Sequence, residues 1–369
     1  MQEELRYQLA LTRIPQIGHV LARTLLEKFG SAKAIFQAKR SYLEHTEGMG
    51  TMRTRQIKQF RDFGKIDKEI RFLDKYSIRT FCITDQEYPS RLLHCYDPPT
   101  VLFCKGKTDL NAAKIVAVVG TRNHSEYGKS MTEALIRSLK DLDVIIVSGM
   151  ALGIDACAHK AALQQQLSTI GVMAHGLSYM YPSAHKKLAS DILASSGALI
   201  TEYWSDQPPD KHLFPARNRI VAGLCDAVVV IESGIKGGSM VTADLAIGYH
   251  KDLFVIPGRC TDAKSEGCNL LIKTNRAQLL CTPDDLSDQL GWKQKTITKQ
   301  RIQSTIPFGL NEEEKTLIGQ LSLQKSCHID QLSYACKIPV HKLSWLLLEL
   351  EMRGLITSLP GKMYAVTEF

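Results

Sequence analysis

The stretch that decides the fold is Ile115-Val116-Ala117-Val118-Val119-Gly120-Thr121-Arg122, an apolar run that ends abruptly in a short polar turn. The same pattern recurs where residues 144–147 run into Ser148-Gly149, and where residues 227–231 run into Glu232-Ser233-Gly234. In each case the pattern predicts a buried strand, then a turn of small residues that opens a helix. Such turns place backbone N–H groups and helix N-termini at the carboxyl edge of one sheet, where anions bind.

Apolar strand-like runs alternate with helical patterns on both sides of this stretch, over residues 114–292. The expected strands are 115–119, 144–148, 169–173, 198–201, 227–231 and 253–256, and the expected helices are 125–140, 153–166, 183–196 and 239–249. Continuous apolar strands separated by helices indicate a parallel sheet that is covered on both faces. The sequence therefore predicts an α/β fold, a Rossmann-like doubly wound parallel sheet.

Residues 1–66 show a different pattern, with apolar residues at helical spacing and two glycine-containing turns, Ile14-Pro15-Gln16-Ile17-Gly18 and Glu47-Gly48-Met49-Gly50. Helical units joined in this way resemble helix-hairpin-helix modules, in which backbone N–H groups meet a DNA phosphate without reading sequence. Six cations follow the second turn: Arg53, Arg55, Lys58, Arg61, Lys65 and Lys68. We predict an N-terminal helical domain of the helix-hairpin-helix or SAM-like type, with either a DNA contact or a solvated basic face.

The rest of the chain divides into three parts. Residues 67–292 are predicted to form one extended Rossmann-like domain, and the polar residues 293–309 a linker. In residues 310–369, Asn311 precedes three glutamates as a helix N-cap, and two further helical patterns follow. Two short strands then flank Pro360-Gly361 as a hairpin. Three helices and a hairpin predict a C-terminal winged helix.

Composition narrows the class of protein. The apolar and charged fractions, 44% and 23%, are ordinary for a soluble globular protein. The net charge of +8 is uneven: it is +5 over residues 1–69, 0 over residues 70–292 and +3 over residues 293–369. None of the ten cysteines forms a C-x-x-C pair, so no zinc site is expected. The polar N-terminus and the absence of a long apolar run predict a cytoplasmic protein without a membrane partner.

Several motifs of nucleotide and hydrolase chemistry are absent. No G-x-G-x-x-G follows the first strand, and Gly128-Lys129-Ser130 lacks the first glycine of a P-loop. No G-x-S-x-G elbow is present. Asp155 and His159 stand one helical turn apart, so an acid–base pair is conceivable. We favour an Asp near a helix N-terminus, where the helix dipole stabilises it, with a hydrogen-bonded His one turn later.

The remaining signal is a set of anion-binding turns with cations close to them. Arg122 follows the first strand, Arg217-Asn218-Arg219 precedes an apolar run, and Lys236 precedes Gly237-Gly238-Ser239 with Thr242 one turn later. We expect these residues in loops or at the ends of β-strands. Several phosphate sites along one sheet edge would fit the phosphates of a nucleic-acid chain better than a single nucleotide. The aromatic residues before Arg217 are candidates for stacking on unpaired bases or for loop core: Tyr203, Trp204 and Phe214.

Read in order, these motifs resemble the DNA-processing protein A family (DprA, also called Smf). The resemblance covers about 150 residues and is carried by Gly120-Thr121-Arg122, Ser148-Gly149-Met150-Ala151-Leu152-Gly153-Ile154-Asp155, Tyr181-Pro182, Phe214-Pro215-Ala216-Arg217-Asn218-Arg219, Lys236-Gly237-Gly238-Ser239-Met240-Val241-Thr242, Pro257-Gly258-Arg259 and Gly267-Cys268-Asn269-Leu270-Leu271-Ile272. The C-terminal module is similar to the winged helix found in many members. Thr121 stands where the family often has Ser, and Arg276-Ala277 where it often has Gly-Ala.

The resemblance implies a bacterial cytosolic protein that binds and protects single-stranded DNA without sequence preference. It implies loading of the RecA recombinase onto strands coated by single-strand binding protein during DNA uptake and recombination. It also implies a homodimer that is not an enzyme and needs no cofactor. The DNA-binding residues expected from the turns and the resemblance together are Gly120, Thr121, Arg122, Ser148, Gly149, Phe214, Arg217, Asn218, Arg219, Lys236, Gly238, Ser239 and Thr242.

Two alternatives stay open on the sequence. The Rossmann turns also suit an enzyme that acts on a free nucleotide, as in the related phosphoribohydrolases. The winged helix also suits a regulator that binds duplex DNA, although the predicted third helix carries few cations. The sequence leaves undecided whether the N-terminal or the winged-helix domain touches DNA, and which aromatic residue stacks on bases.

Overall fold

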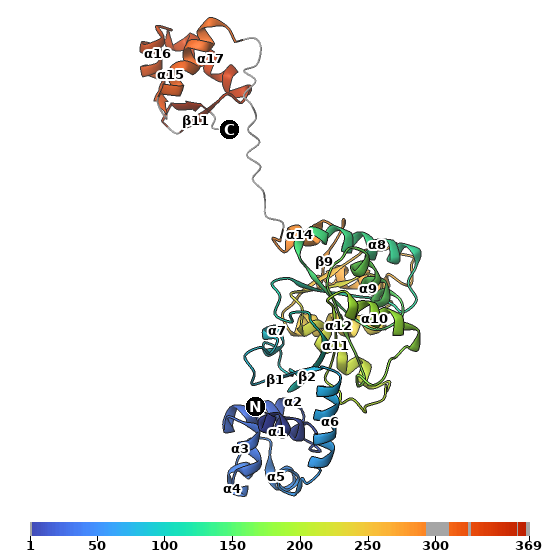
Figure 1. Ribbon diagram of the computed structural model, residues 1–369. Helices are drawn as coiled ribbons and strands as arrows, with labels where there is room; N and C mark the ends of the chain where they lie inside the picture. The colour runs from blue at the N-terminus through green and yellow to red at the C-terminus, as the bar shows by residue number, and fades with distance from the viewer. Residues whose placement is uncertain (1, 293–309, 324–325, 360, 367–369) are drawn as a thin grey trace. The chain divides into compact units, whose positions relative to one another are not determined.

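The structure is a computed structural model that describes residues 2–292, 310–323, 326–359 and 361–366 of the 369-residue chain (Figure 1). Two compact units form, residues 1–292 and residues 293–369. The linker predicted over residues 293–309 lies outside the described residues. Within the described residues, no helix is long and apolar enough to cross a membrane.

The first unit begins with helices only: α1 (Gln2–Thr12), α2 (His19–Phe29), α3 (Ala32–Gln37), α4 (Arg40–Glu44), α5 (Gly50–Gln59) and α6 (Phe63–Lys75). The two predicted glycine turns stand between α1 and α2 and between α4 and α5. Gly48 and Gly50 have φ of +75° and +63°, a left-handed backbone that glycine adopts without steric cost. Helix α6 runs through residue 66, so the predicted domain boundary falls inside a helix.

A nine-stranded sheet follows, in the order β1-β2-β6-β5-β4-β3-β7-β8-β9. Its strands are β1 (Arg79–Cys82), β2 (Val101–Gly106), β3 (Ile115–Val119), β4 (Ile145–Gly149), β5 (Thr169–Val172), β6 (Ala198–Thr201), β7 (Ala227–Val230), β8 (Asp252–Val255) and β9 (Gln278–Leu279). Strands β3 to β9 pair in parallel, whereas β1 and β2 add an antiparallel edge beside β6. The Rossmann-like prediction is confirmed, with this antiparallel extension.

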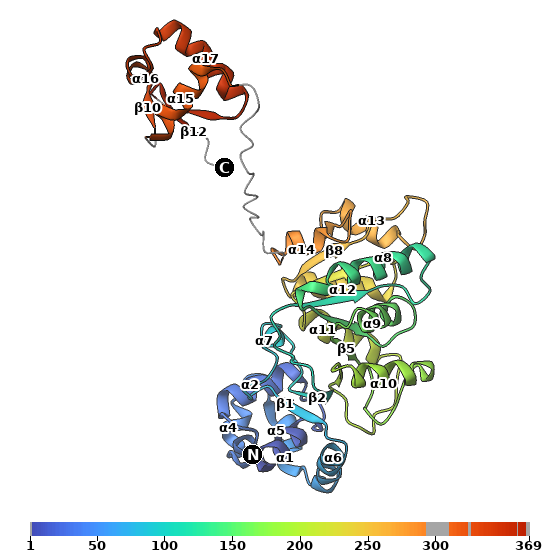
Figure 2. The same ribbon diagram turned by 45° about the horizontal axis from the view of Figure 1, so that its top comes forward.

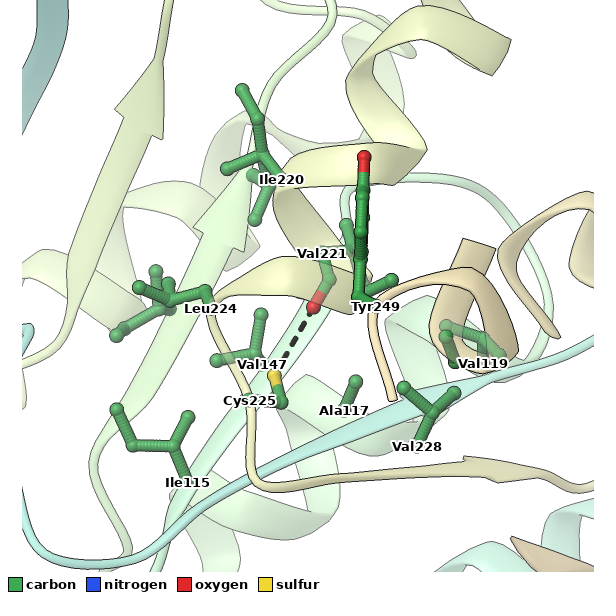
Figure 3. Packing of buried hydrophobic residues seen from close by; sticks show 14 of the residues in the cluster. Ile115, Ala117, Val119, Val147, Ile220, Val221, Leu224, Cys225, Val228 and Tyr249 are labelled. Atoms are coloured by element: carbon green, nitrogen blue, oxygen red, sulfur yellow. Dashed lines mark hydrogen bonds between the residues drawn. The ribbon is translucent and has the colours of Figure 1, made fainter. Parts of the chain in front are cut away.

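Helices cover both faces of the sheet (Figure 2). They are α7 (Ser90–Leu93), α8 (Glu126–Ser138), α9 (Ile154–Gln164), α10 (Lys186–Ala194), α11 (Leu213–Gly223), α12 (Gly238–Gly248), α13 (Glu266–Lys273) and α14 (Asp285–Gln289). Alternate residues of β3 belong to two separate cores, because successive strand side chains point to opposite faces. Val116 and Val118 pack with α8 and α9. Ala117 packs with α11 and α12, in the cluster that Figure 3 shows.

Helix α11 is the main departure from the sequence expectation. We expected Arg217-Asn218-Arg219 in a loop, but these residues lie in the middle of α11 (Leu213–Gly223). The apolar run that follows them, Ile220-Val221-Ala222, packs into the core against the sheet. The short edge strand β9 was also missed, because Gln278 and Leu279 are both exposed and show no apolar pattern.

The N-terminal helices are joined to the sheet by a shared core and by polar contacts. Leu9, Ile66 and Leu73 pack with Phe103 of β2 and with Trp204. The Glu69 carboxylate accepts hydrogen bonds from the backbone N–H and the hydroxyl of Ser205, at 2.9 and 2.5 Å. These contacts explain why residues 1–292 form one compact unit.

The second unit confirms the winged helix. It contains α15 (Glu312–Leu323), β10 (Cys327–His328), α16 (Ile329–Cys336), α17 (Val340–Met352), β11 (Ile356–Leu359) and β12 (Met363–Val366), with the strands in the order β10-β12-β11. Asn311 Oδ1 accepts from the Glu314 N–H at 2.8 Å, and Glu314 Oε2 accepts from the Asn311 N–H at 2.7 Å. This reciprocal capping box starts α15 at the position that the sequence predicted.

Candidate nucleic-acid interface

A pocket of about 450 Å³ lies at the carboxyl ends of β3 and β7. At this point the strand order reverses, because β4 to β6 follow on one side of β3 and β7 to β9 on the other. Strands β3 and β7 are neighbours in the sheet. The chain leaves β3 for α8, which packs in one core, and leaves β7 for α12, which packs in the other. Open α/β sheets bind ligands at such a switch point, because the diverging loops leave a crevice between them. The predicted turns 120–122 and 237–239 both line this pocket.

Glu232 holds the first of these turns in place. Its backbone carbonyl accepts from the Thr121 N–H at 2.8 Å, and its Oε2 accepts from the Ser125 N–H at 2.9 Å. A Cβ on Gly128 would lie 2.4 Å from Glu232 Oε2, so a side chain there would displace the Glu232 carboxylate. The N-terminus of α8 therefore faces a carboxylate of the protein itself. The expectation that this helix start offers an open anion site is wrong.

The N-terminus of α12 opens into the pocket instead. Gly237 is its N-cap residue, and its first-turn residues Gly238 and Ser239 line the pocket together with Thr242. First-turn N–H groups have no acceptor within their own helix, and the helix dipole favours an anion beside them. The Ser239 hydroxyl donates to Ser233 Oγ at 2.8 Å, which ties α12 to the turn after β7.

Arg217 reaches the pocket from α11 although it is buried, at 5% exposure. Its guanidinium donates to the Val172 carbonyl, and its Nε donates to Asn218 Oδ1 at 3.2 Å. Asn218 in turn donates to the Gly238 carbonyl at 3.3 Å. Burial lowers the pKa of Arg217, and the nearby Asp155 carboxylate opposes that shift. Helices α11 and α12 therefore hold this cation rigidly at the pocket wall.

Asp155 is the carboxylate of the pocket, and the sequence reasoning had set it aside as structural. It lies at the start of α9 and is 7% exposed. Burial raises the pKa of Asp155 to about 6, against the effect of Arg217. A Cβ on Gly149 would lie 2.5 Å from Arg217 Nη2 and 2.6 Å from Asp155 Oδ2. Gly149 is thus the point where the cation and the carboxylate approach each other.

Arg219 lies elsewhere, and this corrects the expectation that it lines the groove with Arg217. Its guanidinium pairs with the buried Glu202 carboxylate and donates to the Asp97 carbonyl. His19 Nε2 lies 2.8 Å from the same Glu202 carboxylate. Burial alone would raise the pKa of Glu202, but His19 and Arg219 lower it below its usual value. Arg217 and Arg219 are two positions apart in α11. Because a helix turns about 100° per residue, their side chains point in nearly opposite directions.

Aromatic side chains stand beside the pocket in a small group. Phe214 lines the pocket, and the Arg122 guanidinium lies 5.6 Å from its ring centre. The ring of Tyr181 lies 5.6 Å from that of Phe214, and Tyr181 is 48% exposed. Trp204 is instead core: it is buried, and its Nε1 donates to Thr12 Oγ1 at 3.0 Å. The half-buried Tyr203 does not line the pocket.

The structure brings most of the predicted residues together. The pocket is lined by Gly120, Thr121, Arg122, Gly149, Phe214, Arg217, Asn218, Gly238, Ser239 and Thr242. Three others do not line it: Ser148, Arg219 and Lys236. Ser148 is buried and donates to the Val118 carbonyl at 2.6 Å, whereas Lys236 is exposed in the turn before α12. Asp155 had been interpreted as structural, and Lys211 had not been considered; the proximity of Lys211 to Phe214 was a signal that could have found it.

His159 is hydrogen-bonded, as favoured from the sequence, and the structure places it in the core. Nδ1 lies 2.7 Å from Thr169 Oγ1, and Nε2 lies 3.2 Å from the Gly149 carbonyl oxygen. Burial lowers the pKa of His159 to about 4. Within the described residues, no group of three or more His, Cys, Asp or Glu side chains is placed to hold a metal ion.

We expect His159 to make the protein less stable in mild acid. The unfolded chain takes up a proton near pH 6.5 and the folded chain only near pH 4, so stability is lost as the pH falls through this window. The shift corresponds to about 3 kcal/mol at most. Urea denaturation of wild type and His159→Gln between pH 7.5 and 4.5 checks this. If the difference in unfolding free energy between the two proteins does not change with pH, His159 is not the group responsible.

The fold defines a Rossmann-like protein with an appended winged helix, and its pocket lies at the carboxyl ends of β3 and β7. The family model of DNA recombination-mediator protein A matches residues 79–291, and that of the DprA winged helix domain matches residues 303–362. The chain belongs to the DNA recombination-mediator protein A (DprA/Smf) family.

Individual relatives agree with this assignment. The chain is 32% identical to Protein Smf of Escherichia coli over 336 residues, covering 88% of each chain. It is 42% identical to DNA processing protein DprA of Streptococcus pneumoniae over 207 residues, 56% of this chain and 72% of the relative. The X-ray structure of the S. pneumoniae protein aligns with a TM-score of 0.67 at 33% identity, over 77% of this chain and 97% of that chain. DNA processing protein A of Helicobacter pylori, solved in a study of its single-stranded DNA binding mode, aligns with a TM-score of 0.53 at 35% identity, over 58% and 96%.

Proposed function

We propose that this protein binds single-stranded DNA without sequence preference through the pocket between β3 and β7. The observation that carries the proposal is the set of donors that converge there. The first turn of α12 presents N–H groups, and Arg122, Arg217 and Lys211 add positive charge. Phe214 and Tyr181 offer faces on which unpaired bases stack. The reported single-stranded DNA binding mode of the H. pylori relative supports the proposal.

We further propose that the protein acts in DNA uptake or recombination, as the sequence resemblance implies. It would protect single strands and load a RecA-type recombinase onto strands coated by single-strand binding protein, as a cytoplasmic homodimer. Membership of the recombination-mediator family supports this role. A recombinase ATPase assay on strands coated by single-strand binding protein tests it. If the protein binds the strand but leaves the lag of the recombinase unchanged, the loading role is wrong.

Binding should prefer single strands and weaken with salt. For single-stranded DNA the logarithm of affinity falls by about 0.7 per phosphate contact for each tenfold rise in salt. With about three phosphate contacts, affinity falls roughly 20-fold between 50 and 200 mM salt. Fluorescence anisotropy with a labelled 20-nucleotide strand and its duplex, across that salt series, checks both points. Equal or tighter binding to the duplex would contradict the site proposal and favour a regulator acting through the winged helix.

The winged helix offers little for duplex recognition by α17 in the described residues. Lys342 pairs with Glu313 at 2.6 Å, and Arg353 pairs with Glu349 and lies 3.4 Å from Glu314. Cations engaged in this way are less available to phosphates. The exposed face of α17 instead carries Trp345, Leu348 and Met352.

One observation favours the alternative of an enzyme that acts on a free nucleotide. Asp155 lines the pocket with a pKa of about 6, and a raised carboxyl pKa is a feature of acid–base sites. A turnover assay with nucleoside monophosphates tests this alternative. Product that scales with protein concentration and disappears in Asp155→Asn would establish it.

A further inference from the structure

The start of α8 holds an anion that belongs to the protein itself. Glu232 follows shortly after β7, and it is only 2% exposed. Its Oε2 accepts from the Ser125 N–H at 2.9 Å, and its Oε1 accepts from the Ser125 hydroxyl. Ser125 Oγ accepts in turn from the Gly128 N–H at 3.0 Å. Two backbone donors at this helix start are therefore engaged by one carboxylate, directly or through the hydroxyl.

The backbone around Glu232 is shaped to admit the carboxylate. Gly128 stands in the first turn of α8, and a Cβ there would lie 2.4 Å from Glu232 Oε2 and 2.5 Å from its Cδ. The backbone of Glu232 is fixed as well, because its carbonyl accepts from the Thr121 N–H at 2.8 Å. Backbone N–H groups and the helix dipole attract a carboxylate and a phosphate alike. The carboxylate thus occupies the place that an external phosphate would need.

The two helix starts at the switch point differ in this respect. In doubly wound folds the phosphates of a nucleotide bind at helix starts that follow the strands there. Both β3–α8 and β7–α12 are units of this kind. Residues 237–239, at the start of α12, line the pocket, whereas none of the described residues 123–128 does. One of the two anion positions therefore opens into the pocket, and the chain itself fills the other.

We propose that Glu232 is a specificity-determining residue, because its carboxylate closes the start of α8 to phosphate and so leaves a free nucleotide one anion position at this edge instead of two. A phosphate beside the buried carboxylate would be repelled where solvent screens charge weakly. A strand loses less, because it carries further phosphates to the cations of the pocket. This comparison with a strand rests on the proposed function, whereas the closure of α8 does not.

Opening the start of α8 in the full chain tests the inference. Glu232→Ala should lower the Tm by about 4–8 °C, because buried donors lose a charged acceptor. Inorganic phosphate should then bind in place of the carboxylate. For a Kd of about 5 mM, 50 mM phosphate should raise the Tm of Glu232→Ala by roughly 3–6 °C more than that of wild type, relative to sodium chloride of equal ionic strength. A shift that arises in the pocket is common to both proteins and cancels.

Control variants separate this closure from a structural role. Glu232→Gln keeps the position filled, and Glu126→Ala removes an exposed carboxylate from the same helix turn, so neither should gain the extra phosphate shift. Glu232→Ser repeats the test if Glu232→Ala does not fold. A phosphate shift of the opened variant that equals the wild-type shift overturns the inference. Failure of both variants to fold in 50 mM phosphate also overturns it, because phosphate then does not replace the carboxylate.

Strand binding gives a second readout. In Glu232→Ala the start of α8 becomes available to one more phosphate of the strand, so the slope of log affinity against log salt should steepen by about 0.7. Glu232→Gln should keep the wild-type slope. An unchanged slope in Glu232→Ala overturns the part of the inference that concerns the strand. If phosphate stabilises Glu232→Ala but wild type binds no strand, the proposed function is wrong and the closure of α8 by Glu232 stands.

Discussion

Arg217→Ala is expected to lower the affinity for single-stranded DNA by about 10- to 100-fold. Arg217 places a buried guanidinium at the pocket wall, and a hydrogen bond to a charged group contributes about 1.5–3 kcal/mol. The contacts of Arg217 with the Val172 carbonyl and with Asn218 hold it in one position, so the free protein loses little entropy on binding. Anisotropy titrations with oligonucleotides of different sequence should show the same loss for each.

Two variants make this result specific. Arg137→Ala removes an exposed cation from the last turn of α8. This turn lies at the end of α8 away from the pocket, so the substitution should change affinity less than twofold. Arg217→Lys keeps the charge without the planar fork and should fall between wild type and Arg217→Ala. A folded Arg217→Ala protein that binds as tightly as wild type would show that the strand lies elsewhere.

Arg219→Ala is expected to lower the free energy of unfolding by about 3–5 kcal/mol, because removal of one partner leaves a buried charge uncompensated. The carboxylate left behind is Glu202, whose side chain is 4% exposed. His19 still faces it, but Arg219 also bonds to the Asp97 carbonyl, which would lose its donor. Urea denaturation followed by circular dichroism measures the loss.

Glu202→Gln provides the matched test. Neutralising the carboxylate removes the charge that Arg219 compensates, so Arg219→Ala should cost less in the Glu202→Gln background than in wild type. Strand affinity of the folded fraction of Arg219→Ala should stay close to that of wild type. If Arg219→Ala has normal stability but binds DNA weakly, Arg219 contacts the strand and the structural role assigned to it is wrong.

These two expectations separate residues that the sequence presents as a pair. Arg217 and Arg219 stand two positions apart in one motif and carry the same charge. In a loop both would be free to face one strand. In α11 they diverge, one to the pocket and one to the junction with the N-terminal helices. The double variant Arg217→Ala/Arg219→Ala would therefore mix a binding defect with a folding defect.

The fold was predictable because its signals are local. Apolar runs such as residues 115–119, 144–147 and 227–231 are too short and too continuous for a surface helix, and these three runs end in glycine-containing turns. The same holds for the winged helix, where Asn311 before three glutamates and Pro360-Gly361 between two short apolar runs mark the element ends in the sequence. Helix α11 was missed because Pro215 and the cationic motif that follows it are typical of a loop. Its continuous apolar run, Ile220-Val221-Ala222, is confined to the second half, so the helical pattern is too short to recognise.

The pocket was predictable only in part. Turns that follow parallel strands must meet at one edge of the sheet, so Gly120, Gly149 and Gly238 could be grouped from their positions in the chain. The roles of charged side chains could not be derived in this way. Glu232 occupies the N-terminus of α8 through its contact with Ser125, about 110 residues away in the chain. Asp155 lies in the pocket near Arg217, about 60 residues away in the chain.

The sequence by itself determined the doubly wound sheet, the winged helix and the edge of the sheet at which the pocket lies, because strand period, turn glycines and helix caps act within a few residues. Only the tertiary structure decided which charges remain available there. Burial and pairing depend on residues distant in the chain: Glu202 engages Arg219, Glu232 occupies the start of α8, and Asp155 stands opposite Arg217. The residue type alone does not distinguish a charged side chain at the pocket from one that is paired in the core. Its contacts in the folded chain decide whether it is available to a ligand or stabilises the fold.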